Sequence, residues 1–476
     1  YFDEKGWLYF TKEQYDLFYP SYGDTYPTYN GAIGMTYEQG GSGSAGLGVK
    51  TKEGTELTLK DRISHHLTTG LSTIEVASAN ASVLHKEFLI YFRNAKEKPM
   101  GSTKSYLIKN NSDDKVESLI KLLDMHHVKY GSPSSSSNVK GFSYQNNKEV
   151  KVSVDKKDLL ISVYQPKSNL VKALFEPQSK LNDSLTYDIT AWSLPYARGL
   201  DAYALDMKIE SDTYKELIRK EDTLQIQKPY AFITKWNSTQ DVAYLSHLLK
   251  HKVKVRFSTQ DFTIEGKQYA AGSLIITRAG NEKLKGFDSI VKAVAKNNSR
   301  HIVPVKTGLV SSGSDFGSNK VSYMKPPKIA VLSGPNVSSL NFGAIWHFFE
   351  QQIGYELNVM DHSYFTRVDL NKYNVLILPN GNYGSILNKK QMSKLEAWVE
   401  RGGKIVVMGS AISNFAASDA FEIAKYESKE KEKEAKSRRD SIRKANQLGS
   451  YELKERNYLS NLVQGGVYKT TLDHTH

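Results

Sequence analysis

The chain has 476 residues with 39% hydrophobic content, and its 64 Lys and Arg against 51 Asp and Glu give a formal net charge of +13. At about 150 residues per domain this length predicts roughly three domains, and the absence of cysteine excludes disulfides, thiolate metal sites and cysteine nucleophiles. We expect no transmembrane segment, because no run of 18 apolar residues occurs, and no nucleic-acid partner, because the basic residues are spread out and mixed with acids.

Near the start of the chain, Glu38 closes a short apolar stretch, residues 31–37, that follows a loop dense in tyrosine, glycine and proline, residues 18–30. This pattern predicts a turn-rich loop and then a strand. A carboxylate at the end of such a strand either caps buried backbone or acts as a general base. The surrounding residues favour the general base.

Residues 19–41 resemble the end of the catalytic domain of zinc carboxypeptidases of the carboxypeptidase A class. In that family a Glu ending a central strand activates a zinc-bound water, and a Tyr on an upstream loop closes over the terminal carboxylate of the substrate. The resemblance implies that Glu38 is the catalytic base and that Tyr22, or its rival Tyr19, binds substrate. The implied substrates are the C-termini of peptides or proteins.

The resemblance also implies zinc, which the family holds with an H-x-x-E motif and a later His, all upstream of the Glu. Residues 1–37 contain no His, so these ligands are not in this chain. The chain opens on Tyr1 without Met and stops without a closing element, so we expect a fragment, cut at both ends, that is inactive by itself. The family further implies a periplasmic or secreted protein.

A glycine-rich stretch follows at residues 40–48, with a formal G-x-G-x-x-G pattern. No helix start follows it, as a dinucleotide site would require, so we expect a flexible loop beside Glu38. From Thr58 a capping-box-like start and apolar residues at helical spacing predict one long helix reaching Phe88. The resemblance implies that this helix ends the carboxypeptidase-like domain, residues 1–97, and packs on its sheet.

His65 and His66 lie on this helix. Adjacent helical side chains point about 100° apart and cannot chelate one ion together. We therefore expect surface or packing histidines here.

Two stretches, residues 98–215 and 216–318, repeat one pattern of strand, helix, strand and strand. The repeat predicts a pair of small α/β modules, each with a helix between parallel strands. The bridge at residues 187–199 resembles a segment of multi-domain carboxypeptidase-like proteins of Bacteroidota-type bacteria. Its Trp192 and Tyr196 either pin the two modules together, which we favour, or line a groove for peptide.

Residues 307–318 are rich in glycine and serine and predict a linker to a last domain, residues 326–476. There, strands at 328–334, 375–379 and 402–409 alternate with helices at 340–354 and 389–401, which predicts a doubly wound parallel sheet.

This last pattern resembles the class I glutamine amidotransferase-like fold, of flavodoxin type, whose nucleophile is a Cys after the strand matched by residues 404–408. Ser410 lies there instead. It would act as a nucleophile only with a base such as His347 beside it, so we favour a non-catalytic accessory or oligomerisation domain.

Residues 427–456 are almost all charged or polar, and residues 465–472 read as a returning strand. The charged stretch predicts a salt-bridged helix or a disordered insertion, with a tether to acidic polymers as the functional alternative.

The whole chain is thus expected to be α/β, with a carboxypeptidase-like end, duplicated modules and an amidotransferase-like domain. The expected function is zinc-dependent hydrolysis of C-terminal peptide bonds. The alternative is a non-catalytic protein that binds peptides or cell-wall fragments on a degenerate carboxypeptidase scaffold.

Overall fold

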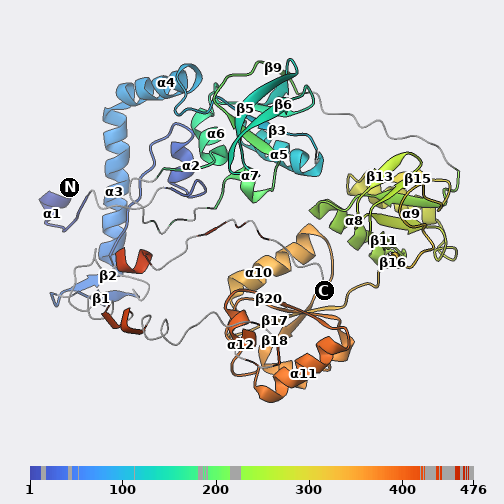
Figure 1. The fold of residues 1–476 in the computed structure, drawn as a ribbon. Coiled ribbons are helices and arrows are strands. Elements are labelled where there is room, and N and C mark those ends of the chain that lie inside the picture. The colour runs from blue at the N-terminus through green and yellow to red at the C-terminus, as the bar shows by residue number, and fades with distance from the viewer. Residues whose placement is uncertain are drawn as a thin grey trace. The chain divides into compact units, whose positions relative to one another are not determined.

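The computed structural model contains helices and several sheets, as the α/β class requires (Figure 1). It divides into two compact units, one of residues 1–217 with 437–476 and one of residues 218–436. The structure describes all residues except 12–17, 41–45, 52, 112, 181–185, 187, 189–190, 215–226, 417, 419, 422, 424–435, 439, 442–455, 461–464, 467, 469 and 471–476.

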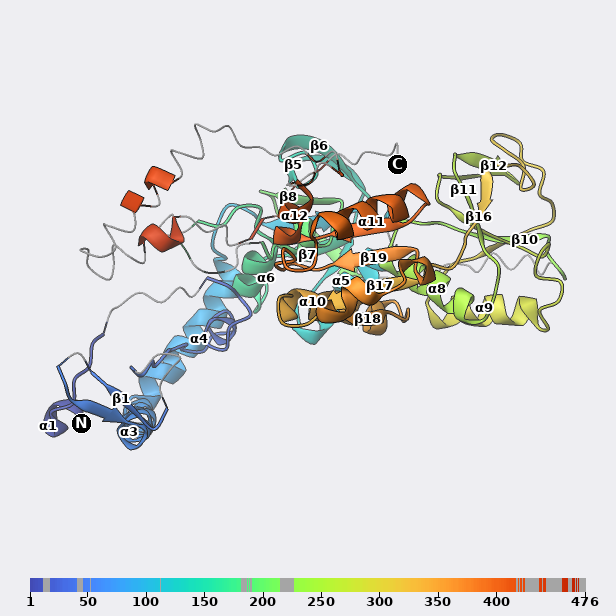
Figure 2. The ribbon, with the colours of Figure 1, turned by 90° about the horizontal axis from the view of Figure 1, so that it is seen from below.

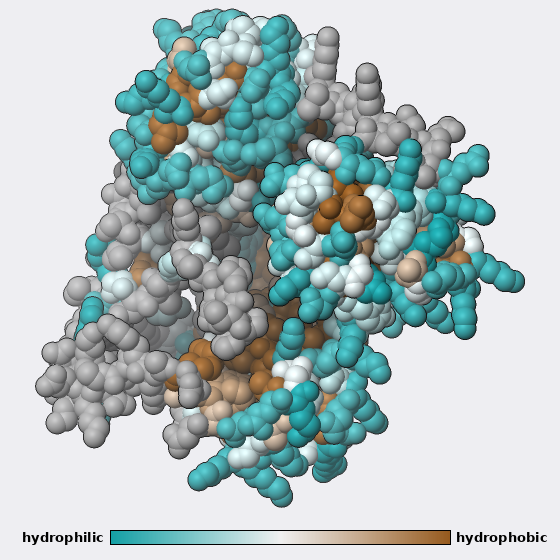
Figure 3. Space-filling view, turned by 45° about the vertical axis from the view of Figure 1, so that its right-hand side comes forward, coloured by the Kyte–Doolittle hydropathy of each residue, from teal (hydrophilic) through white to brown (hydrophobic). Residues whose placement is uncertain are grey.

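On the face seen in Figure 3, hydrophilic side chains predominate and hydrophobic ones gather in a few patches. In the part of the chain that the structure describes, no helix combines the length and the apolar character needed to cross a membrane.

In the described part of residues 1–97 there are two short helices, an antiparallel hairpin and two long helices. Its elements are α1 Phe2–Lys5, α2 Thr25–Thr28, β1 Gly48–Lys50, β2 Glu56–Thr58, α3 Leu59–Ala79 and α4 Ala81–Glu97. The predicted start of α3 is confirmed, because the Thr58 hydroxyl accepts the N–H of Asp61 at 3.2 Å and the Asp61 carboxylate accepts the N–H of Thr58 at 3.0 Å.

Two predictions for this segment are wrong. Residues 31–37 form no strand, because no described strand pairs with them. The predicted long helix is broken at Asn80, and Figure 1 shows α4 leaving α3 at an angle. The Asn80 side chain donates to the carbonyl of Val76 at 2.8 Å, the local bond by which Asn competes with helix continuation.

The apolar stripe of α3 is exposed. Ile63, Leu67 and Leu71 are 57%, 61% and 59% exposed, and no residue of α3 is buried. The sheet expected beneath this helix is therefore not among the described residues.

The first module is a seven-stranded antiparallel sheet of order β6-β5-β8-β3-β7-β4-β9 with α5 and α6 packed on it. Alternate residues of β3 face opposite sides, so Tyr106 and Ile108 join the core beneath the helices while Leu107 joins a smaller cluster. The elements are β3 Ser105–Ile108, α5 Asp113–Met125, β4 Gly131–Pro133, β5 Ser137–Ser143, β6 Lys148–Val154, β7 Leu159–Ser162, α6 Ser168–Phe175, α7 Leu194–Ala197, β8 Ala202–Leu205 and β9 Ser211–Thr213.

The second module has a five-stranded sheet of order β15-β10-β14-β11-β16 and a separate hairpin, β12-β13. Its elements are β10 Ala231–Thr234, α8 Thr239–Lys250, β11 Arg256–Ser258, β12 Phe262–Ile264, β13 Lys267–Tyr269, β14 Leu274–Thr277, α9 Phe287–Asn297, β15 Val303–Val305 and β16 Val321–Tyr323. The first module contains the same order as β8-β3-β7-β4-β9, with β5-β6 in the place of the hairpin.

The predicted helix between strands of the same direction is present in both modules, but those two strands are not neighbours in the sheet. β7 pairs antiparallel with β3 on one side and β4 on the other, and β14 does the same with β10 and β11. The helix after the first strand does connect two strands of the same direction. A later strand lies between them, however, so every neighbouring pair in these two sheets is antiparallel.

The expected linker at residues 307–318 belongs to the second module instead. Phe316 is 3% exposed and sits in a core cluster with Phe262, Ser312 bridges to Thr263, and β16 beyond it pairs with β11. The small residues of this stretch allow its backbone to lie close to neighbouring chain: a Cβ at Gly313 would lie 2.6 Å from the backbone oxygen of Asp261.

The last domain is a four-stranded parallel sheet of order β18-β17-β19-β20. Ala330 and Leu332 of β17 share a core with α11, whereas Ile329 and Val331 share one with α10, so the helices cover opposite faces (Figure 2). The elements are β17 Ile329–Ser333, α10 Ser339–His347, η1 Phe348–Gln352, β18 Asn358–Asp361, η2 His362–Arg367, η3 Leu370–Lys372, β19 Val375–Leu378, α11 Lys389–Glu400, β20 Lys404–Val407, η4 Gly409–Ala411 and α12 Ile412–Ala416.

The sequence pattern did not predict β18. Of the charged stretch 427–456, only residues 436–438, 440–441 and 456 are described, and the glycine loop at 41–45 lies outside the described residues. In the expected returning strand, the described residues 465, 466, 468 and 470 are not in a strand, and the rest lie outside the description.

Candidate functional sites

Glu38 is exposed and lies on the wall of a pocket of about 630 Å³. Three parts of the chain contribute to this pocket: residues 1–11, residues 36–40 and the middle of α3, residues 65–72. The lining residues are Tyr1, Phe2, Asp3, Leu8, Tyr9, Phe10, Thr11, Thr36, Tyr37, Glu38, Gln39, Gly40, His65, His66, Thr69 and Ser72. The pocket therefore combines aromatic rings and hydroxyl groups with two carboxylates, those of Glu38 and Asp3.

One hydrogen bond ties the residues around Glu38 to the tyrosine-rich loop. The Thr36 hydroxyl donates to the carboxylate of Asp24. This bond holds the pKa of Asp24 below its usual range. The path of the chain from Asp24 to Glu38 is thus set by a side-chain contact rather than by the strand that we expected.

The histidines of the pocket do not form a metal site. The His65 ring packs against Trp7 with centroids 4.4 Å apart, and its Nδ1 lies 2.9 Å from the side-chain oxygen of Gln39. Among the described residues, no group of three or more His, Asp or Glu side chains could hold a metal ion. The described residues therefore do not supply a zinc site.

Tyr19 and Tyr22 lie together but do not line the Glu38 pocket. Their half-buried rings are 5.2 Å apart, and the Tyr19 ring is 5.9 Å from Trp192. Phe18 packs on the same indole at 4.4 Å. Tyr19 therefore packs against the first module with Tyr22 beside it, and neither tyrosine lines the pocket of the candidate base.

Asp188, which is not among the residues predicted from the sequence, holds this loop. It is fully buried, and its Oδ2 accepts the backbone N–H groups of Phe18 and Tyr19 at 2.8 and 3.0 Å. One signal in the sequence could have identified Asp188, because it lies in a stretch with aromatic residues. A carboxylate that is buried among such residues is costly unless it is hydrogen-bonded.

Trp192 and Tyr196 have contacts within residues 1–217. The Trp192 indole N–H donates to the carbonyl of Ala173 at 2.9 Å, and Tyr196 packs on Tyr144 at 5.0 Å. These contacts stabilise the first unit itself, and the pin between the two modules stays a prediction.

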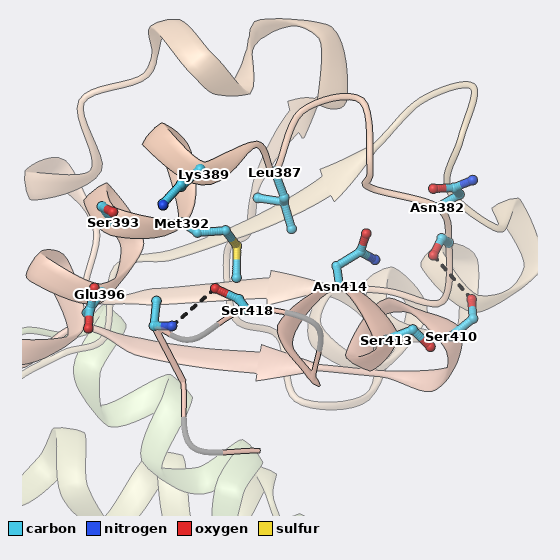
Figure 4. Close-up of a pocket in the computed structure, with 12 residues that line it drawn as sticks. Asn382, Leu387, Lys389, Met392, Ser393, Glu396, Ser410, Ser413, Asn414 and Ser418 are labelled. Atoms are coloured by element: carbon cyan, nitrogen blue, oxygen red, sulfur yellow. Dashed lines mark hydrogen bonds between the residues drawn. The ribbon is translucent and has the colours of Figure 1, made fainter. Parts of the chain in front are cut away.

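A second pocket, of about 890 Å³, lies beside Ser410 in the parallel-sheet domain (Figure 4). It is lined by Gly381, Asn382, Leu387, Lys389, Met392, Ser393, Glu396, Ser410, Ser413, Asn414, Ser418 and Ala420. These residues follow β19 and β20 or belong to α11 and α12. The pocket therefore lies at the carboxyl ends of parallel strands, where sheets of this type bind ligands.

Asn380 organises the turn that carries Ser410. Its Oδ1 accepts the backbone N–H of Ser410 at 2.8 Å and the hydroxyl at 2.7 Å. Gly409 has φ +58°, and a Cβ there would lie 2.5 Å from the Asn380 oxygen. This position requires glycine for both reasons.

The hydroxyl of Ser410 has no base among its described partners, which are the Asn380 oxygen and, at 3.2 Å, the carbonyl of Gly381. The Nδ1 of His347, the base considered above, lies 3.5 Å from the side-chain nitrogen of Gln352. Neither an amide nor a carbonyl can take the hydroxyl proton, so this geometry does not activate Ser410.

Comparison of the chain with protein-family models, curated proteins and solved structures gives no match.

Proposed function

We propose that this chain is part of a zinc carboxypeptidase-type hydrolase in which Glu38 is the general base. The observation that carries the proposal is the position of Glu38 on the wall of a pocket that also holds aromatic and hydroxyl side chains. A carboxylate in such a pocket can take a proton from the attacking water and pass it to the leaving amine. The substrates would be C-termini of peptides or proteins.

The proposal places the zinc ligands upstream of Tyr1, as the resemblance implies, and the described residues offer no substitute set. When bound, the ion would supply a water of lowered pKa. The same resemblance places the protein in the periplasm or outside the cell.

The exposed stripe of α3 supports the proposal. Ile63, Leu67, Leu71 and Ile74 are each more than half exposed. A contiguous apolar helix face normally packs against a partner, and in the proposed fold the partner is the sheet of the carboxypeptidase domain.

The test is the variant Glu38→Gln in the complete protein, assayed on a peptide with a free C-terminus. We expect kcat to fall about 10²- to 10⁴-fold, the usual contribution of a general base. Glu53→Gln is the matched control, because Glu53 is exposed and does not line the pocket. Hydrolysis by Glu38→Gln within threefold of the parent protein would sink the proposal.

A peptide-binding protein on the same scaffold is the second candidate. The aromatic wall favours it, because Tyr9 and Phe10 line the pocket and are 57% and 67% exposed, as suits contact with apolar side chains. In that case the complete protein would bind the peptide without cleaving it. Titration calorimetry with the same peptide separates the two candidates.

A further inference from the structure

The pocket beside Ser410 has two polar walls of different chemistry (Figure 4). On α11, Lys389, Ser393 and Glu396 follow one another at spacings of four and three residues, which places them on one helix face. Opposite lie the neutral side chains of Asn382, Ser410, Ser413 and Asn414. The apolar ends of Met392 and Leu387 point into the space between the walls.

The two charges on α11 lie at opposite ends of this wall. Seven residues separate Lys389 from Glu396, which is a rise of about 10 Å along a helix. In the part of the chain that the structure describes, neither the Lys389 ammonium nor the Glu396 carboxylate has a hydrogen-bond or ion-pair partner. The pocket thus presents one cation and one anion with neutral hydrogen-bonding groups between them.

The position of Lys389 adds to its attraction for an anion. It is the first residue of α11, whose first turn contains no acidic residue. The positive end of the helix dipole therefore acts together with the ammonium and is not neutralised by a neighbour.

The opposite wall can bind amide groups. Asn382 accepts the N–H of Gly384 at 3.1 Å through its oxygen, and Asn414 donates to the carbonyl of Ala411 at 3.1 Å. Within the described residues, the Asn382 amide nitrogen and the Asn414 oxygen are left to bind a ligand, one as donor and one as acceptor.

We propose that this pocket binds a short peptide of about three residues with both termini free. An extended residue spans about 3.3–3.6 Å, so a tripeptide places its charged ends about 10 Å apart, which matches the rise from Lys389 to Glu396. The ligand carboxylate binds Lys389, its ammonium binds Glu396, and its peptide groups bind the Asn and Ser side chains. Met392 and Leu387 contact its side chains.

Other ligand classes fit the pocket less well. A neutral sugar would bind the hydroxyl and amide groups but leave both charges of α11 without a counterpart. A phosphorylated ligand would bind Lys389 but be repelled by Glu396. The site is independent of the hydrolase proposed above, since none of its residues lines the Glu38 pocket.

The test is calorimetric titration of the full chain with trialanine, N-acetyl-trialanine, trialanine amide and maltotriose. We expect trialanine to bind and blocking either end to weaken binding at least tenfold. Lys389→Gln should remove the preference for a free carboxylate, and Glu396→Gln the preference for a free amine. Lys390→Gln and Glu400→Gln are the matched controls, because both are exposed residues of α11 outside the pocket.

Four results would overturn the proposal. They are no binding of trialanine at millimolar concentration, equal binding of the blocked peptides, tighter binding of maltotriose, and equal effects of the pocket and control variants. Glu38→Gln should leave this binding unchanged, so failure of the hydrolase proposal and failure of this one are told apart.

Discussion

The carboxylate of Asp188 accepts a hydrogen bond from the backbone N–H of Tyr19 at 3.0 Å, although 169 residues separate the two in sequence. The tyrosine-rich loop near the start of the chain is thus held by the first α/β module. The division of the chain agrees with this contact, because residues 1–217 belong to one compact unit. The module therefore has a structural role in placing the loop.

Replacing Asp188 with Ala should loosen the loop at Tyr19. Two backbone N–H groups would lose their acceptor at a cost of about 1–3 kcal/mol. Hydrogen exchange at Phe18 and Tyr19 should become about tenfold faster or more, and Asp188→Asn, whose oxygen still accepts, should restore part of the protection. Asp206→Ala is the control, since Asp206 is exposed. Unchanged exchange in Asp188→Ala would show that the loop is held by other contacts.

Acidification should weaken the docking of the same loop through His126. Its Nδ1 lies 2.7 Å from the Tyr26 hydroxyl, and burial, followed by the charge of Lys167, lowers the pKa of His126. An undocked ring with the ordinary pKa of about 6.5 takes up a proton more readily than the docked ring. The stability from this contact is thus fully present above about pH 6.5 and is lost as the pH falls through the lowered value.

Protection of residues 18–31 against hydrogen exchange, corrected for intrinsic rates, should therefore be lower at about pH 5 than at about pH 7.5. His126→Gln should remove this dependence, whereas His85→Gln, at an exposed position on α4, should keep it. A pH dependence that survives in His126→Gln would assign it to another group.

The second module contains two Asp–Arg pairs that should respond differently to the same substitution. Asp241 and Arg300 are 1% and 6% exposed and 3.2 Å apart, while Asp288 and Arg278 are 32% and 35% exposed. Asp241→Asn should lower the free energy of unfolding by about 3–5 kcal/mol, because it leaves a buried guanidinium without its carboxylate. Asp288→Asn should lower the free energy of unfolding by about 1 kcal/mol or less, because water screens that pair.

The measurement is native-state hydrogen exchange at Phe232, which lies buried in β10, an interior strand of that module's five-stranded sheet. Asp241 also accepts the N–H of Ser238 at the start of α8, so part of its effect should appear at that helix start. If Asp241→Asn and Asp288→Asn reduced the protection of Phe232 equally, the burial of the ion pair would not determine its contribution to stability.

Local sequence signals predicted individual elements well. The strands at Ile329–Ser333 and Val375–Leu378 and the helix at Lys389–Glu400 lie within the expected stretches. Short β-branched runs and helical spacing of apolar residues depend on neighbours close in the chain, so the residues themselves carry that information.

Pairing between strands could not be predicted in the same way. The strand expected at residues 31–37 has no described partner, and β7 lies between β3 and β4 although it follows both in sequence. Whether a strand forms and which way its neighbour runs depend on segments far along the chain. Local patterns do not contain this information.

Residue type and local spacing were enough to predict the α/β class and to single out Glu38 and Ser410. Contacts between distant parts of the chain place Tyr19 against Trp192 and Asp188 rather than in the pocket of Glu38, and they place the Ser410 hydroxyl against Asn380 rather than a base. Burial and hydrogen bonding join residues that are distant in the chain, so local patterns do not reveal contacts that exist only once the fold has formed.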